Sequence, residues 1–150
     1  MKKILSLLII IASINLYDGF ISKVNAQSGL IIIVNNDNPT GEMSVGQVKL
    51  YYTRKIKKRW PKTNASIKPV ALKKSSSKTA FLSSVLKMSA SEVDNYFKQR
   101  QFANAEAPPV QFSSDAEVIN FIVNNPGAIG YVSKAGYNAA SGKVKAVLTL

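Results

Sequence analysis

Five consecutive apolar residues at positions 30–34 constrain the fold of this chain more than any other segment, because they read Leu-Ile-Ile-Ile-Val without a polar residue among them. A strand with one face in water alternates apolar and polar residues, whereas a strand covered on both faces is apolar throughout. The run therefore predicts a strand that is buried on both faces. Turn-forming residues at positions 35–41 close it.

Serine residues mark where the helices are expected to begin. Three pairs have the spacing of a capping box, in which a serine oxygen accepts an N–H of the first turn and a Gln or Glu side chain reaches back: Ser44 with Gln47, Ser89 with Glu92, and Ser114 with Glu117. A fourth helix is expected after the serines at 75–77. The first helix is expected to include Ile56 and to end at Trp60–Pro61, and the last to stop at Asn124–Gly127.

Three further segments are expected to be strands, at positions 67–72, 128–132 and 144–148. Pro69 in the first of them indicates either a sheet edge or the beginning of a strand, because proline cannot donate to a ladder. The resulting order, β-α-β-α-α-α-β-β, predicts an α/β layered fold with at least some parallel pairing.

The composition excludes most kinds of active site. The chain has 150 residues, enough for one domain, and contains no His and no Cys. Without them a Ser-His-Asp triad, a thiol nucleophile and the usual zinc ligands are excluded. Glu92 and Asp94 are two positions apart and do not share a helix face, so no carboxylate pair is placed for acid–base work. We therefore expect no enzyme, no metal site and no cofactor.

Residues 1–26 have the pattern of a secretory signal peptide. Lys2 and Lys3 precede an apolar stretch at positions 4–14, which is shorter than the roughly 20 residues of a membrane-spanning helix. Val24 and Ala26 occupy the −3 and −1 positions of a cleavage site. We expect cleavage after Ala26 and an exported domain, periplasmic or secreted, over residues 27–150. An uncleaved anchoring segment is the alternative.

Positive charge belongs to the expected mature domain. The chain carries 20 Lys and Arg against 8 Asp and Glu, a formal charge of +12, and removing residues 1–26 leaves 17 against 7, or +10. Every charged residue between Glu42 and Glu92 is basic. Two interpretations stay open for positions 54–62: a face that attracts anions, or a solvated helix surface. Nucleic acid is not an expected partner, because Trp60 is the only aromatic residue in that cluster and stacking needs several.

Residues 73–79, Lys-Lys-Ser-Ser-Ser-Lys-Thr, lie between an expected strand and an expected helix. Amides at a helix start have no partner in the helix, and the helix dipole favours an anion there. The hydroxyls and lysines of this segment can therefore form an oxyanion cradle. The alternative is that the serines are plain N-caps.

Three parts of the chain together resemble the phosphate-binding periplasmic proteins of ABC importers, and more closely their small exported relatives: Ser44–Trp60, Ile67–Phe81, and Ser114–Val132 with its Pro-Gly-Ala-Ile-Gly-Tyr-Val end. The resemblance covers nearly all of residues 27–150. It implies a single lobe of a type II periplasmic-binding-protein-like fold, with a mixed sheet flanked by helices. It also implies binding of phosphate or a related oxyanion, and a link to phosphate import.

In the family that the chain resembles, a Gly-Ser-Gly-Thr-Arg-like turn at a helix start holds phosphate. Its Ser, Thr and basic residue fall on Ser75, Ser77 and Lys78, and its two glycines on Lys74 and Ser76. The resemblance thus implies a ligand site formed by five consecutive residues: Lys74, Ser75, Ser76, Ser77 and Lys78. The family's upstream acid falls on Lys73 and its upstream Arg near Ala71. These departures predict weaker selection for protonated phosphate and a preference for more highly charged anions.

A single lobe leaves a bound anion half exposed, whereas the two-lobed relatives close over it, and this difference leaves alternatives open. One is a non-catalytic structural or interaction module, whose basic face docks on anionic envelope lipids, polysaccharide or an acidic partner protein. Another is a homodimer that recreates a two-lobed cleft. An ABC permease or another envelope component is the macromolecular partner that the resemblance implies.

Overall fold

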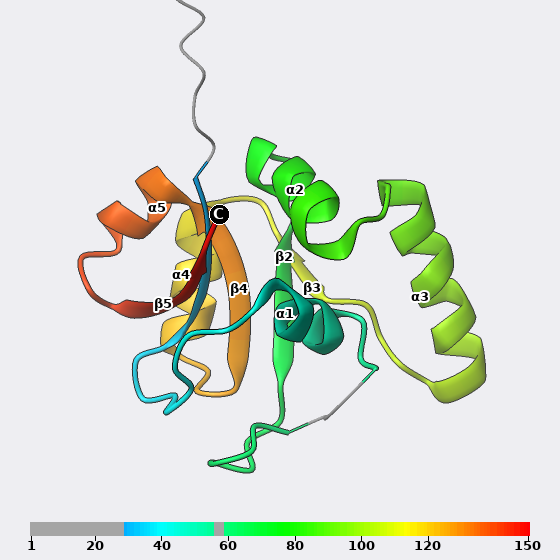
Figure 1. Cartoon of the computed structure of the whole chain (residues 1–150), viewed down its shortest axis with the longest axis horizontal. Coiled ribbons are helices and arrows are strands. Elements are labelled where there is room, and N and C mark those ends of the chain that lie inside the picture. The colour runs from blue at the N-terminus through cyan, green and yellow to red at the C-terminus, as the bar shows by residue number, and fades with distance from the viewer. Residues whose placement is uncertain (1–28, 56–58) are drawn as a thin grey trace, which may run out of the picture.

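A five-stranded mixed sheet forms the centre of the computed structural model (Figure 1), which describes residues 29–55 and 59–150. The expected leader and its cleavage site after Ala26 lie outside the described residues, as do Ile56, Lys57 and Lys58. The strands, in chain order, are β1 (Leu30–Asn35), β2 (Lys68–Leu72), β3 (Val110–Phe112), β4 (Ala128–Ser133) and β5 (Val144–Thr149). Their order across the sheet is β3-β2-β4-β1-β5.

The strand β1 is buried along all six of its residues, as the apolar run predicts. It lies between β4 and β5 and is antiparallel to both. The three strands β2, β3 and β4 are parallel to one another, with β2 between the other two. The expected partly parallel, mixed sheet is confirmed. Pro69 stands near the beginning of an interior strand and not at a sheet edge.

In the described part of the chain, five α-helices and one π-helical turn flank the sheet: α1 (Val45–Tyr52), α2 (Ser76–Phe81), the π-helical turn η1 (Leu82–Leu86), α3 (Ala90–Asn104), α4 (Asp115–Val123) and α5 (Lys134–Ala139). Within the described residues, no helix is long and apolar enough to cross a membrane. The capping boxes that begin α1 and α3 are confirmed.

The third expected capping box is only half formed. The Ser114 hydroxyl accepts the Glu117 N–H at 3.3 Å, but the Glu117 carboxylate accepts the N–H of Ser113 at 2.7 Å, one residue before the cap. This hydrogen bond to the Glu117 carboxylate joins the residue after β3 to the first turn of α4. Spacing alone did not distinguish these two acceptor geometries.

Neighbouring residues of β4 show that helices cover both faces of the sheet. A Cβ on Gly130 would lie 2.8 Å from side-chain atoms of Val118 and Ile122, so glycine allows α4 to pack this closely. Tyr131, the next residue, stacks on Phe81 of α2 with ring centroids 4.2 Å apart. Because successive side chains of a strand point to opposite faces, α4 and α2 lie on opposite sides of the sheet (Figure 1).

The first helix is shorter than expected. The prediction that it continues toward Trp60–Pro61 is wrong, because α1 ends at Tyr52. The Thr53 hydroxyl donates to the Lys49 carbonyl at 2.8 Å, and Arg54 has a left-handed backbone with φ of 56°, which stops the helix. Trp60 is instead a buried anchor, whose Nε1–H donates to the Gly127 carbonyl at 3.0 Å.

Two elements were not expected from the sequence, β3 and α5. The strand β3 has three residues, lies at the sheet edge and follows Pro108 and Pro109, so it shows no alternating pattern long enough to detect. The helix α5 has no buried residue and therefore no apolar stripe. The observed order contains both in addition to every strand and helix that the sequence predicts.

Candidate functional site

Three helices begin at the same edge of the sheet. The parallel strands β2, β3 and β4 all end there, and they are followed by α2, α4 and α5 (Figure 1). Each of the three helices has a serine N-cap: Ser75, Ser114 and Ser133. In open α/β sheets, ligands bind outside the carboxyl ends of the strands, where helix N-termini present free N–H groups. This edge is therefore the candidate functional site.

Two of the three helix starts already hold carboxylates of the chain itself. Asp115 Oδ2 accepts hydrogen bonds from the Ser133 N–H at 3.2 Å and from the Ser133 hydroxyl at 2.5 Å. It lies so close to the first turn of α5 that a Cβ on Gly136 would be 2.4 Å from the same oxygen. The start of α4 carries Asp115 and Glu117. Negative charge is thus supplied internally at α4 and α5.

The start of α2 differs, because no acidic residue lies in its first turn. The Ser75 hydroxyl accepts the Lys78 N–H at 2.9 Å, so Ser75 is an ordinary N-cap, as one of the two interpretations of this segment proposed. The backbone N–H groups of Ser76 and Ser77 have no acceptor among the described residues. Two aligned donors therefore stay free at this helix start.

The five residues expected from the sequence lie together at this start, in different environments. Lys74, Ser75 and Ser76 are exposed, Lys78 is half-buried, and Ser77 is buried with 4% of its surface exposed. The Ser77 hydroxyl makes no hydrogen bond within the described part of the chain. The Lys78 ammonium donates to the Lys73 carbonyl at 3.0 Å, so it is folded back over the turn that precedes α2.

Phe81 of α2 belongs to an aromatic cluster with Tyr52 and Tyr131. Phe81 packs against Tyr52 with centroids 4.5 Å apart, in addition to its stack on Tyr131. The Tyr52 hydroxyl donates to the Val70 carbonyl at 2.8 Å, and the Tyr131 hydroxyl accepts the Leu72 N–H at 3.2 Å. Burial raises the pKa of Tyr52 well above its ordinary value and raises the pKa of Tyr131 to about 12. Both phenols are therefore neutral at physiological pH, and their rings pack against Phe81 of α2.

The basic residues after α1 divide into structural and exposed groups. The Arg54 guanidinium donates to the Ile67 carbonyl at 3.0 Å, and its carbonyl accepts from Arg100 at 3.3 Å, so Arg54 joins the loops on which α3 rests. Lys55, Arg59 and Lys62 are exposed. Over the described residues, no group of three or more Asp or Glu side chains is placed to hold a metal ion.

Comparison with known proteins identifies the family. A sequence profile described as a PBP superfamily domain matches residues 18–148. No protein with a curated description matches the sequence. Among solved structures, the chain is similar to an ABC-type phosphate transport receptor from Vibrio cholerae, with a TM-score of 0.60 and 23% identity over 79% of this chain and 45% of that one.

Two further solved structures have the same fold. One is a putative phosphate ABC transporter substrate-binding protein with bound phosphate from Clostridium perfringens, with a TM-score of 0.61 and 23% identity over 79% of this chain and 44% of that one. The other is PstS from Borrelia burgdorferi, with a TM-score of 0.60 and 17% identity over 79% of this chain and 46% of that one.

The chain spans less than half the length of these solved structures. The mixed sheet and its flanking helices are thus one lobe of a type II periplasmic-binding-protein-like fold. By the extent of the profile match and by this fold, the chain belongs to the PBP superfamily domain family.

Proposed function

We propose that this protein is an exported, non-enzymatic solute-binding domain that holds phosphate or a related oxyanion at the start of α2. One observation carries the proposal: of the three helix starts at the carboxyl edge of the sheet, that of α2 has no carboxylate, and its Ser76 and Ser77 N–H groups are free. The similar structures from Vibrio cholerae and Clostridium perfringens, described as phosphate transport proteins, support this choice of ligand.

Each of the five proposed residues has a role in this site. The amides and hydroxyls of Ser76 and Ser77 donate to the anion, Ser75 fixes the turn as its N-cap, and Lys74 and Lys78 supply positive charge. Binding would exchange the hydrogen bond of Lys78 to the chain for one to the anion. Because no carboxylate of the first turn can accept a proton from the ligand, dianionic phosphate and pyrophosphate are preferred over monoanions.

Isothermal titration with phosphate, pyrophosphate and sulfate tests the site. Ser76 is the first helical residue, and Ser75 before it is extended with ψ of 164°, so Ser76→Pro keeps the helix while it removes one free N–H. We expect Ser76→Pro to weaken phosphate binding by about 10-fold or more, since a hydrogen bond to a charged group is lost.

The matched control is Ser76→Ala, which removes the hydroxyl but keeps the N–H, and which should weaken binding less than Ser76→Pro does. Pyrophosphate should bind more tightly than phosphate. If the wild-type protein gives neither heat nor a thermal shift with any of the three anions at millimolar concentration, the proposed ligand is wrong. Equal affinities of Ser76→Pro and Ser76→Ala would exclude the backbone donor.

A second candidate function uses the exposed cations after α1. Lys55, Arg59 and Lys62 are exposed, and the chain has no acidic residue between Glu42 and Glu92 to neutralise them. In this function the protein docks on anionic envelope surfaces or an acidic partner. The quadruple change of Lys55, Lys57, Lys58 and Arg59 to Ser should then abolish salt-sensitive binding to anionic vesicles. Phosphate titration at Ser75–Lys78 should stay nearly unchanged, and vesicle binding that survives the change excludes this function.

The proposed location and partners follow from the leader pattern and the relatives. We propose that residues 1–26 are removed on export, and that the domain of residues 27–150 works with an ABC permease or another envelope component. A single lobe covers an anion from one side only, and two copies of the chain would supply the second side. Native mass spectrometry of the exported protein tests both points. We expect the exported chain to begin at Gln27 and to form a dimer in the presence of phosphate. An intact leader would contradict the removal of residues 1–26, and a monomer in phosphate would contradict the dimer.

A further inference from the structure

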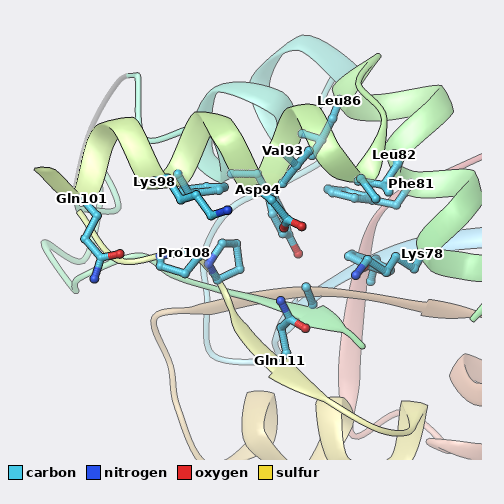
Figure 2. A pocket seen from close by; sticks show the side chains of 16 residues that line it. Lys78, Phe81, Leu82, Leu86, Val93, Asp94, Lys98, Gln101, Pro108 and Gln111 are labelled. Carbon is cyan, nitrogen blue, oxygen red and sulfur yellow. The ribbon is translucent and has the colours of Figure 1, made fainter. Parts of the chain in front are cut away.

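A cavity of about 230 Å³ lies between α2, η1 and α3 and meets the first turn of α2 at Lys78 (Figure 2). None of Lys74, Ser75, Ser76 or Ser77 lines it, and Lys78 is the one residue that it shares with the proposed oxyanion site. Its walls are formed mainly by apolar side chains from three segments: Phe81, Leu82, Leu86, Val93, Phe97 and Pro108.

The cavity lies beside one face of α3, while polar contacts hold a neighbouring face of this helix. Tyr96 and Arg100, four residues apart, form polar contacts: the Tyr96 hydroxyl donates to the Thr53 carbonyl at 2.6 Å, and Arg100 donates to the Arg54 carbonyl. The neighbouring face, with Val93, Asp94 and Lys98, is directed toward Phe81 and Lys78 of α2, as Figure 2 shows. Of the fifteen residues of α3, only Phe97 is buried. The second face therefore borders open space.

A buried tyrosine hydroxyl that accepts one hydrogen bond and donates none within the described part of the chain lines this space. Tyr131 is only 1% exposed, and its hydroxyl accepts the Leu72 N–H. Its own O–H finds no acceptor among the described residues, whereas the neighbouring Tyr52 hydroxyl donates to the Val70 carbonyl. The pKa of Tyr131, raised to about 12 by burial, keeps this proton in place at physiological pH. A tyrosine hydroxyl can donate as well as accept, so the Tyr131 O–H can donate to an acceptor placed in the cavity.

The charges at the cavity favour an anionic acceptor. The lining contains two lysines, Lys78 and Lys98, and one carboxylate, Asp94, so its net charge is positive. Gln101 and Gln111 add neutral amides. The volume lies above that of a cavity of about 150 Å³ that binds benzene and below the roughly 300–1,000 Å³ of drug-sized pockets. A ligand of this size has on the order of ten non-hydrogen atoms.

We propose that this cavity binds a medium-chain carboxylate, with the alkyl chain packed against Phe81, Leu86 and Val93 and the carboxylate accepting hydrogen bonds from Tyr131 and Lys78. The apolar walls exclude water from the chain, and burial of the alkyl groups drives binding. The charge-assisted hydrogen bonds select the anionic head. This binding site shares the Lys78 ammonium with the proposed oxyanion site, but its apolar walls and Tyr131 do not belong to that site.

Octanoate is the probe, and octylamine and acetate are its matched controls, since the first changes the charge of the head and the second removes the chain. Titrations followed by calorimetry in phosphate-free buffer should show saturable octanoate binding. Octylamine and acetate should bind about 10-fold more weakly or not at all, because each lacks one of the two recognised parts. Absence of saturable octanoate binding, or octylamine binding of equal strength, overturns the proposal.

Two variants locate the ligand. Val93→Trp fills the cavity from α3 and should abolish octanoate binding while the phosphate titration stays as in the wild type. Tyr131→Phe should weaken octanoate about 10-fold or more, since a hydrogen bond to a charged group is lost. Phe102→Ala changes a side chain of α3 that is 92% exposed and should leave octanoate affinity unchanged. If Val93→Trp binds octanoate with wild-type affinity, the proposed binding site is wrong. This measurement tests the site even if Tyr131→Phe does not fold.

Discussion

Replacing Phe81 by Ala is expected to lower the free energy of unfolding by about 3–5 kcal/mol, because the change removes a buried ring and leaves a cavity. Phe81 is 2% exposed, stacks on Tyr131 at 4.2 Å with planes 10° apart, and packs against Tyr52 at 4.5 Å. It is one of two buried residues of α2, together with Ser77. Chemical denaturation followed by circular dichroism measures the loss.

Phe102→Ala is the matched control for that change. The ring of Phe102 is 92% exposed, so its removal should alter the free energy of unfolding by no more than about 0.5 kcal/mol. In Phe81→Ala we also expect faster hydrogen exchange of the α2 amides and weaker phosphate binding, since the aromatic cluster holds the proposed site. A loss below about 1 kcal/mol would show that α2 is anchored by other contacts.

Gly127→Ala is expected to cost more than about 3 kcal/mol or to prevent folding, because the new Cβ meets backbone and not a flexible side chain. It would lie 2.1 Å from the Ser66 carbonyl oxygen. The Gly127 carbonyl also accepts hydrogen bonds from Trp60 Nε1–H at 3.0 Å and from the Lys68 N–H at 2.9 Å. Displacement of this residue therefore disturbs the start of β2 and the packing of Trp60 together.

The control for Gly127 is Gly41→Ala, because a Cβ on Gly41 would meet nothing within 4 Å. This change should stay within about 0.5 kcal/mol of the wild type. Thermal unfolding distinguishes the two variants, at about 2–4 °C per kcal/mol for a chain of this length. A Gly127→Ala protein as stable as Gly41→Ala would mean that the segment before β2 can move away without cost.

Local chemistry explains which parts of the fold could be predicted from the sequence. The apolar run of β1 and the boxes at Ser44 and Ser89 depend on residues close in sequence, and the structure confirms them. The antiparallel placement of β1 between β4 and β5 depends on residues about 100 positions apart. The end of α1 depends on the left-handed Arg54, which no local pattern marked.

The candidate site, like the fold, has one part that local sequence predicts and another that depends on contacts between distant residues. Ser75–Lys78 could be recognised as a helix start next to lysines, because N-caps are local signals. The feature that distinguishes this helix start from the other two depends on tertiary structure. The Asp115 carboxylate accepts a hydrogen bond from the Ser133 hydroxyl, which is 18 positions away in the sequence. The sequence shows Tyr52 and Tyr131 only as positions in an expected helix and an expected strand, and it does not reveal that the Tyr131 hydroxyl accepts the Leu72 N–H. The sequence thus indicates this segment as a candidate, whereas the contrast between the three helix starts depends on the folded structure.

Both outer strands of the sheet are arranged in ways that limit pairing with other molecules. At one edge, β3 has only three residues and follows Pro108 and Pro109, which cannot donate hydrogen bonds. At the other, the Met43 N–H donates to the Val147 carbonyl at 2.7 Å, so the loop before α1 covers part of β5. These two features shorten the row of free N–H and C=O groups at each edge of the described sheet. The folded protein is therefore expected to resist strand-to-strand aggregation, even where its concentration is high.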